Sequence, residues 1–251
     1  MDTGSLLNSK IGTFVPGVSM FKLPSRFLLA FTIGIIALLC GPPPSAHSQS
    51  QPQQAAPAVD EWGDDFNGKD LDQTKWERFT FEGGSGGTLK LEGGQLRMRG
   101  VSGSRSGVRS TKTFTGDHFV INAVVAKVGA ALPEPGQSGA WPGNAIVTVL
   151  FDSSGRNRVE WILTSEGIFE AWAIVDGRGE RLDSRNLATK APNPTLSIAR
   201  RGDEYLFALN GQIGLQKTIK NLPRSFHVML YGFGSSETNW DSVQVLMSKK
   251  S

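Results

Sequence analysis

The chain has 251 residues, a formal net charge of +3, one cysteine and three histidines. The one cysteine, Cys40, excludes an internal disulfide framework and cysteine-based zinc sites. His118 and His227 lie far apart in the sequence and show no metal-ligand spacing. No run of lysine and arginine is long enough to form a nucleic-acid footprint, so we expect no nucleic-acid partner.

Residues 1–48 have the order of a secretory signal peptide, and Met20 is an alternative start. Basic Lys22 and Arg26 precede an apolar run at 27–40, and a proline-rich stretch with small residues follows. The apolar run is shorter than the roughly 20 residues of a membrane span. We therefore expect a secreted or periplasmic protein with no membrane span in the mature chain. An uncleaved N-terminal anchor is the alternative.

Residues 49–59, QSQPQQAAPAV, are polar and rich in proline, glutamine and alanine, without apolar periodicity. Such a composition predicts a disordered linker. The remaining residues, 60–251, are about the size of one domain. We expect this domain to be a monomer.

Short alternating runs divided by glycine-containing turns recur after residue 60. Residues 88–100, TLKLEGGQLRMRG, alternate around a glycine pair, and 119–128 and 144–152 are rich in β-branched residues. Asn210-Gly211 is a strong hairpin dipeptide. This pattern predicts an all-β sandwich or jelly roll.

Three segments resemble the concanavalin A-like lectin/glucanase superfamily. They are DDFNGKDLDQTKW (64–76), SIARRGDEYLFALNGQ (197–212) and NWDSVQVLM (239–247). They are closest to laminin-G-like and DUF1080-type jelly-roll domains of secreted bacterial proteins, and the resemblance covers nearly all of 60–251 in element order. It implies a two-sheet antiparallel jelly-roll sandwich with adjacent first and last strands. It also implies a concave sheet face often used for carbohydrate, since many relatives bind or cleave polysaccharides.

The chain departs from this superfamily at one informative place. Family-16 glucanases carry a strand motif of Glu, apolar, Asp, apolar, any residue, Glu. The nearest counterpart here, VEWILTSEG, has Glu160, but Ile162 stands where the motif has Asp, and Glu166 falls six positions later in a turn. The motif is absent, so we do not expect a family-16 mechanism and favour a protein without enzymatic activity.

The stretch 159–172, VEWILTSEGIFEAW, reads as a hairpin whose turn decides its faces. A two-residue loop at 166–167 would mix charged and apolar side chains on both faces, whereas a three-residue loop at 165–167 separates them. We therefore predict the three-residue loop, with Gly167 in its left-handed position and Trp161 in the core. The other face then carries Arg158, Glu160, Ile162, Ile168, Glu170, Trp172, Ile174 and Asp176.

This second face is the candidate ligand-binding surface. Trp172 is expected opposite Glu160, with Glu170 on the same strand and Arg158 nearby. A flat aromatic beside carboxylates and an arginine suits a sugar, whose C–H face packs on the ring while its hydroxyls need fixed polar partners. Trp141, at the end of a long loop rich in glycine and proline, is a further candidate for contact with the ligand.

Three functions remain open at this stage. The first is an exported carbohydrate-binding module. The second is a glycoside hydrolase or polysaccharide lyase using Glu160 and Glu170, because diagonal neighbours on adjacent strands lie about 7–8 Å apart, near the ~6.5–9.5 Å of inverting glycosidases. The third is a structural or adhesive envelope protein whose outward face is simply solvated. Burial of Trp172 under a loop or helix would exclude the binding hypothesis.

Asp64, Asp65 and Asp241 form a second candidate site. If the first and last strands pair, these carboxylates meet at one edge, where relatives often hold a structural calcium ion. The alternative is that each aspartate makes a separate turn or capping hydrogen bond. No other cofactor is expected.

Overall fold

The computed structural model describes residues 59–81, 87–101, 105–131, 142–186 and 191–248. The expected signal peptide, nearly all of the expected linker and Trp141 lie outside these ranges. Within them, no helix is long and apolar enough to cross a membrane.

Sixteen strands account for most of the described chain. In order they are β1 (Val59–Asp64), β2 (Trp76–Phe81), β3 (Thr88–Leu91), β4 (Leu96–Arg99), β5 (Arg105–Ser110), β6 (Phe114–Thr115), β7 (His118–Gly129), β8 (Asn144–Leu150), β9 (Arg158–Thr164), β10 (Ile168–Val175), β11 (Arg178–Asn186), β12 (Thr195–Arg201), β13 (Glu204–Leu209), β14 (Gln212–Thr218), β15 (Ser225–Phe233) and β16 (Glu237–Ser248).

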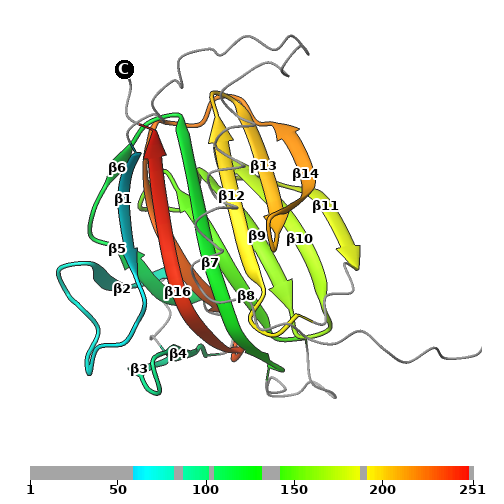
Figure 1. The fold of residues 1–251 in the computed structure, drawn as a ribbon. Helices are drawn as coiled ribbons and strands as arrows, with labels where there is room; N and C mark the ends of the chain where they lie inside the picture. Colours follow the sequence, from blue (N-terminus) through cyan, green and yellow to red (C-terminus); the bar gives the residue numbers. More distant parts are fainter. Residues whose placement is uncertain (1–58, 82–86, 102–104, 132–141, 187–190, 249–251) are drawn as a thin grey trace, which may run out of the picture. The chain divides into compact units, whose positions relative to one another are not determined.

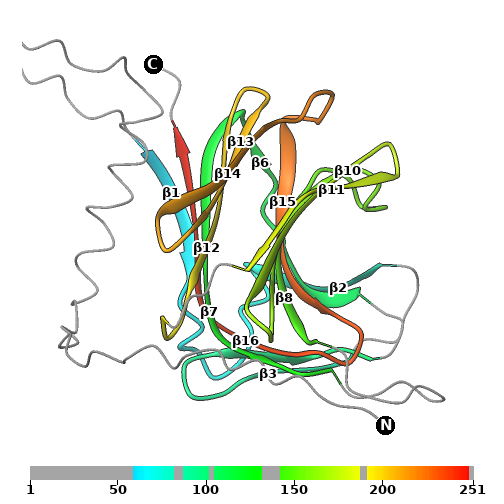
Figure 2. The same ribbon diagram turned by 90° about the vertical axis from the view of Figure 1, so that its right-hand side faces the viewer.

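The strands form two antiparallel sheets that lie face to face (Figure 1, Figure 2). Sheet A has the order β14-β13-β12-β7-β16-β4-β3, with β1 also paired to β16. Sheet B has the order β11-β10-β9-β8-β15-β5-β2, with β6 paired to β15. This arrangement confirms the predicted all-β, two-sheet antiparallel jelly roll.

The first and last strands are neighbours, as the resemblance implies. β1 and β16 pair in antiparallel register from Val59 opposite Ser248 to Asp64 opposite Val243. The N-terminal part of β16 pairs with β4 instead, from Glu237 to Trp240. One long strand therefore joins two shorter ones into sheet A.

Side chains from the inner faces of both sheets fill the space between them. The largest of these side chains are almost completely excluded from water, and burying such aromatic surface is the main stabilising contribution of the fold. They include Trp76, Trp240, Tyr205, Phe66, Phe169, Phe207 and Phe226.

The β9–β10 hairpin has the predicted register. Leu163 lies opposite Phe169 and Trp161 opposite Ala171. Gly167 has φ of 79°, the left-handed backbone that closes a three-residue loop. The segregation of apolar and charged side chains in the sequence therefore identified the correct turn.

Trp161 lies in the core, as predicted. Its indole is 3% exposed and packs at ring-centroid distances of 5.6 Å from Phe169 and 5.5 Å from Phe207. Its Nε1 donates a hydrogen bond to the carbonyl oxygen of Ala208, 3.1 Å away, which joins β9 of sheet B to β13 of sheet A.

The outer face of sheet B is hollowed. In the view of Figure 2, β2 and the β10–β11 end of the sheet lie farther from sheet A than β15 does. The alternating residues of β9 and β10 that do not enter the core point into this hollow. It contains the candidate site.

Candidate functional site

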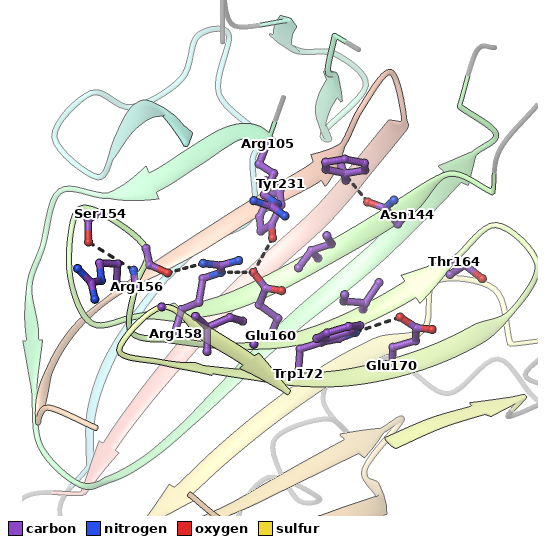
Figure 3. Close-up of a pocket in the computed structure, with 17 residues that line it drawn as sticks. Arg105, Asn144, Ser154, Arg156, Arg158, Glu160, Thr164, Glu170, Trp172 and Tyr231 are labelled. Carbon is purple, nitrogen blue, oxygen red and sulfur yellow. Dashed lines mark hydrogen bonds and ion pairs between the residues drawn. The ribbon is translucent and has the colours of Figure 1, made fainter. Parts of the chain in front are cut away.

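A groove with a volume of about 550 Å³ lies on the outer face of sheet B (Figure 3). It is built from β5, β8, β9, β10, β11 and β15, together with the loop between β8 and β9 and the turn between β10 and β11. The groove brings together four of the residues predicted from the sequence, namely Arg158, Glu160, Glu170 and Trp172. The remaining predicted residue, Trp141, lies outside the described ranges.

A second, smaller apolar cluster lies beside the groove. Its buried members are Phe81, Ile146, Leu150, Met229 and Tyr231, and Phe79 and Ile162 pack against them. Three of its members, Ile146, Ile162 and Tyr231, line the groove itself. A ligand in the groove would therefore contact apolar side chains as well as polar ones, as is usual in binding sites for small molecules.

Glu160 stands at the centre of a buried polar network in the groove. Its Oε1 accepts hydrogen bonds from Arg158 Nε at 2.5 Å and from the hydroxyl of Tyr231 at 2.6 Å. Arg158 also donates from Nη1 to the carbonyl oxygen of Gly155. The residue Glu160 is 5% exposed, so the charge pair and the hydroxyl offset the cost of burying its carboxylate.

Tyr231 serves as a donor in this network. Burial raises the pKa of its phenol well above the ordinary value, and the charge of Glu160 raises it further. The hydroxyl therefore remains protonated and donates to the carboxylate.

A second network holds the tryptophan of the groove. Trp172 is half-buried, and its Nε1 donates to Glu170 Oε2 at 3.0 Å. The other oxygen of Glu170 lies 3.5 Å from Arg181 Nη1 and 3.4 Å from the hydroxyl of Ser184, both on β11. These contacts fix the edge of the indole, and Trp172 lines the groove.

The two glutamates occupy the diagonal positions predicted from the sequence. Trp172 lies opposite Glu160, and Glu170 lies opposite Ile162. Each carboxylate nevertheless belongs to its own hydrogen-bond network. Glu166, the residue six positions after Glu160, is exposed in the turn.

The β8–β9 loop closes one end of the groove. Asp152 organises this loop by accepting hydrogen bonds from the Ser154 hydroxyl at 2.6 Å and from the backbone N–H of Arg156 and Asn157 at 3.1 and 2.7 Å. Partial burial alone would raise the pKa of Asp152, but these hydrogen bonds lower it below its ordinary value. Arg156 is thereby held beside the groove.

Three further side chains complete the groove, and sequence reasoning missed them. Phe233 at the end of β15 is 42% exposed, and the guanidinium of Arg105 lies over its ring, 5.4 Å from the centroid. Asn144 Oδ1 accepts a hydrogen bond from the backbone N–H of Phe233 at 2.7 Å. In the sequence, the only signal at this position is a phenylalanine between two glycines, Gly232 and Gly234, at the end of an apolar run.

The structure does not assemble the candidate calcium ligands into a metal site. Asp64 accepts hydrogen bonds from the backbone N–H of Phe66 at 2.9 Å and from Trp76 Nε1 at 2.8 Å, and Asp65 accepts one from the backbone of the same turn. Asp241 lies at a bulge of β16, where the register shifts. Within the described ranges, no group of three or more His, Cys, Asp or Glu side chains is placed to hold a metal ion. Asp64 and Asp65 thus make the turn hydrogen bonds of the alternative interpretation.

The fold belongs to the concanavalin A-like jelly-roll type. No family model matches the sequence, and no curated protein matches it. Solved structures do match. The endo-β-1,3-glucanase from Pyrococcus furiosus superposes with a TM-score of 0.57 and 12% identity over 76% of this chain and 94% of that chain. A β-glucanase from Bacillus licheniformis superposes with a TM-score of 0.54 and 13% sequence identity. The match covers 76% of this chain and 98% of the glucanase.

A third match is the catalytic domain of an endo-1,3-β-glucanase from Thermotoga petrophila, with a TM-score of 0.54 and 12% identity over 77% of this chain and all of that domain. Identities this low show a shared fold. They do not carry the activity of those enzymes to this chain.

Proposed function

We propose that the protein is an exported carbohydrate-binding module that holds a glycan in the groove on the outer face of sheet B. The observation that carries the proposal is the placement of Trp172. Its indole lines the groove, half-buried, with its N–H held by Glu170. Glu160 and Arg158 are the nearby polar partners, and Trp141 is proposed to contribute from its loop.

The chemistry of the groove supports a sugar ligand. A sugar ring has an apolar C–H face and a rim of hydroxyls, so it needs a flat aromatic surface beside fixed donors and acceptors. Trp172 and Phe233 both line the groove and supply aromatic surface to it. Arg158, Glu160 and Glu170 are held by their own hydrogen bonds, which lowers the entropic cost of ordering them on binding.

One observation favours a second candidate, a glycoside hydrolase or polysaccharide lyase using Glu160 and Glu170. Both hydrogen bonds to Glu160 end on Oε1, and no described residue donates to Oε2. That oxygen is free to meet a substrate. Against this stands the ion pair with Arg158 and the apolar Ile162 between the two carboxylates. A structural or adhesive envelope protein is what remains if no glycan binds.

The fold does not distinguish between the different families of concanavalin A-like domains. We propose the laminin-G-like or DUF1080-type domains of secreted bacterial proteins, on the three quoted segments. Export itself is proposed from residues 1–48. Mass spectrometry of the protein recovered from cells and medium would show whether this segment is removed.

The test of binding is calorimetric titration of the wild type and Trp172→Ala against a panel of polysaccharides. We expect Trp172→Ala to weaken binding at least tenfold, because truncation of a central aromatic in a binding site typically costs about 2 kcal/mol or more. Ile213→Ala is the matched control, since Ile213 is an exposed apolar residue on β14 of the other sheet. Equal affinity in all three proteins, or no binding by any, would reject the proposal.

The same panel separates binding from hydrolysis. Release of reducing ends or unsaturated products would favour the enzyme, and Glu160→Gln and Glu170→Gln would each abolish it. Release that survives both substitutions would exclude this pair of residues.

A further inference from the structure

A cleft with a volume of about 730 Å³ opens at the edge of the sandwich where β11 and β14 are the outermost strands of their sheets. One wall comes from the β10–β11 hairpin, and the other comes from residues 218–220, where β14 ends. The lining includes the apolar side chains of Ala173, Val175, Leu182 and Ile219 and the polar side chains of Arg178, Glu180, Thr218 and Lys220. The cleft thus has the size of a small-molecule site, which is about 300–1,000 Å³.

The groove and the cleft lie on opposite faces of β10. Trp172 and Ile174 line the groove, and the alternate residues Ala173 and Val175 line the cleft, as the alternation of side chains along a strand requires. β11 is the last strand of sheet B at this edge. A flexible chain that leaves the groove can therefore reach the cleft by passing around β11, without crossing another strand of the described sheet.

The wall between the groove and the cleft is low where β11 begins. Gly177 lines the groove, and Gly179 lines both the groove and the cleft. Gly177 has φ of 81°, which the turn requires. The φ of Gly179 lies outside the left-handed region, and a Cβ built there would meet only Cγ1 of Ile174, at an ordinary contact distance of 3.8 Å. A side chain would therefore fit at Gly179, and its absence leaves the way over β11 open.

Arg156 belongs to both the groove and the cleft. Figure 3 shows it at the end of the groove that lies away from Thr164. Its Nη2 donates to the carbonyl oxygen of Asp176 at 3.0 Å, and its own carbonyl oxygen accepts a hydrogen bond from the backbone N–H of Gly177 at 2.8 Å. These two bonds tie the β8–β9 loop to the β10–β11 turn, so the groove and the cleft meet at a fixed point.

The polar side chains of the cleft are not engaged elsewhere. Arg178, Glu180 and Lys220 are exposed, and none of these side chains makes a hydrogen bond or ion pair with another residue of the described ranges. Lys220 follows Ile219, whose side chain is buried and whose backbone N–H donates to the carbonyl oxygen of Asp203 at 2.8 Å. The donors and acceptors of these three side chains suit sugar hydroxyls. No aromatic residue lines the cleft, so among the described residues it offers hydrogen bonds but no stacking surface.

We propose that the groove and the cleft form one extended site for a polysaccharide chain, in which one sugar ring contacts Trp172, the chain passes over Gly179, and further rings bind beside Lys220 in the cleft. This inference rests on the proposed glycan-binding function and specifies its ligand as a chain of several sugar rings. The groove supplies the aromatic contact. The cleft adds hydrogen bonds that only a chain long enough to pass Gly179 can make, so affinity should rise with chain length.

The experiment is calorimetric titration of the protein with oligosaccharides of increasing length, prepared from the polysaccharide that binds best. The affinity of the wild type is expected to rise about tenfold between the shortest oligosaccharide that binds and those long enough to enter the cleft, because the added rings gain hydrogen bonds there. Trp172→Ala should weaken binding at every length, since each ligand uses the groove.

Gly179→Leu tests the passage between the groove and the cleft. It should leave the affinity for the shortest oligosaccharide unchanged and remove the gain with length, because the new side chain occupies the way over β11. Gly179→Ala should keep most of the gain, since its methyl group is smaller. Thermal unfolding of both variants checks that the fold is retained.

Lys220→Gln tests the cleft itself. It should reduce the gain with length about threefold, because it removes a charged donor, and it should leave the shortest oligosaccharide unaffected. The matched control is Lys217→Gln, which removes the same charge from an exposed position on β14 that lines neither the groove nor the cleft. This control should behave as the wild type does.

The outcomes separate the two proposals. A gain with length that is lost in Gly179→Leu and reduced in Lys220→Gln supports the inference. A wild-type affinity that does not rise with length, or a gain that either substitution leaves intact, overturns it and leaves the glycan-binding function standing. A gain that came only from the larger number of equivalent positions on a longer chain would survive both substitutions and so overturn it. Absence of binding at every length overturns both proposals.

Discussion

The two faces of the β9–β10 hairpin each carry one tryptophan, and the two indoles differ in what holds them. Trp161 is enclosed by aromatic rings from both sheets and donates to a backbone carbonyl of sheet A. Trp172 is half-buried and donates to Glu170, two residues away on its own strand. The inner indole therefore joins the two sheets, whereas the outer indole is held within sheet B, through Glu170 and its contacts on β11. One element thus supplies both the core and the candidate site.

The largest predicted effect is on the inner face. Trp161→Ala should lower the free energy of unfolding by about 3–5 kcal/mol, because it opens a large cavity and leaves the carbonyl of Ala208 without its donor. Trp172→Ala should cost about 1 kcal/mol or less, since a half-buried side chain leaves no enclosed cavity. Urea unfolding of both variants measures the difference, and equal losses would break the contrast between the faces.

The next largest effect is predicted for Arg200, which is buried, in comparison with Arg158, whose side chain is 12% exposed. Arg200 is 3% exposed and donates to the carbonyl oxygens of Gly202, Pro223 and Leu222 at 2.7, 2.5 and 3.2 Å. Arg200→Met should destabilise the fold by about 2–3 kcal/mol, because it leaves these carbonyls short of donors. The substitution should leave glycan affinity unchanged.

Arg158, in contrast, binds a carboxylate in the groove. Arg158→Met is expected to reduce glycan binding as well as stability, because it leaves Glu160 buried without its cation. If Arg200→Met and Arg158→Met lowered the free energy of unfolding and the glycan affinity in the same ratio, the two arginines would have equivalent roles and the prediction would be wrong. The paired measurements are denaturant unfolding and calorimetric titration.

The smallest predicted effect is a pH dependence in the loop that ends the groove. The pKa of Asp152 is lowered from 3.8 in the folded protein, so its stabilising contribution is fully present above about pH 4 and is lost as pH falls through the folded pKa. Asp152→Asn should therefore be less stable than the wild type by about 1 kcal/mol at pH 7, and the difference should shrink toward pH 3. Thermal unfolding as a function of pH measures it, and a difference that stays constant would contradict the assignment.

The sequence predicted the hairpin because every constraint on it is local. Charged and apolar residues alternate along both strands, and only one loop length separates them, so the positions of Trp161, Trp172 and Glu160 followed from turn geometry. The same reasoning placed Glu170 diagonal to Glu160. It did not foresee that Trp172 would donate to Glu170, because the sequence fixes the shared face but not the rotamers.

The remainder of the groove could not be predicted in this way. Tyr231 meets Glu160 across 71 residues of sequence, and Phe233 meets Asn144 across 89. These contacts depend on which distant strands pair and in what register, and a single sequence contains no direct signal for either. Arg105 likewise joins the groove only because β5 pairs with β15.

The most direct test of the account follows the two indole N–H groups during ligand titration. In ¹H–¹⁵N spectra, with the signals assigned from Trp172→Phe and Trp161→Phe, addition of the glycan that binds best should shift the Trp172 indole resonance, which lies at the groove. The Trp161 resonance, bonded to Ala208 inside the sandwich, should stay in place. Saturable binding that leaves the Trp172 resonance unmoved would contradict the claim that the outer face of this hairpin is the glycan-binding site.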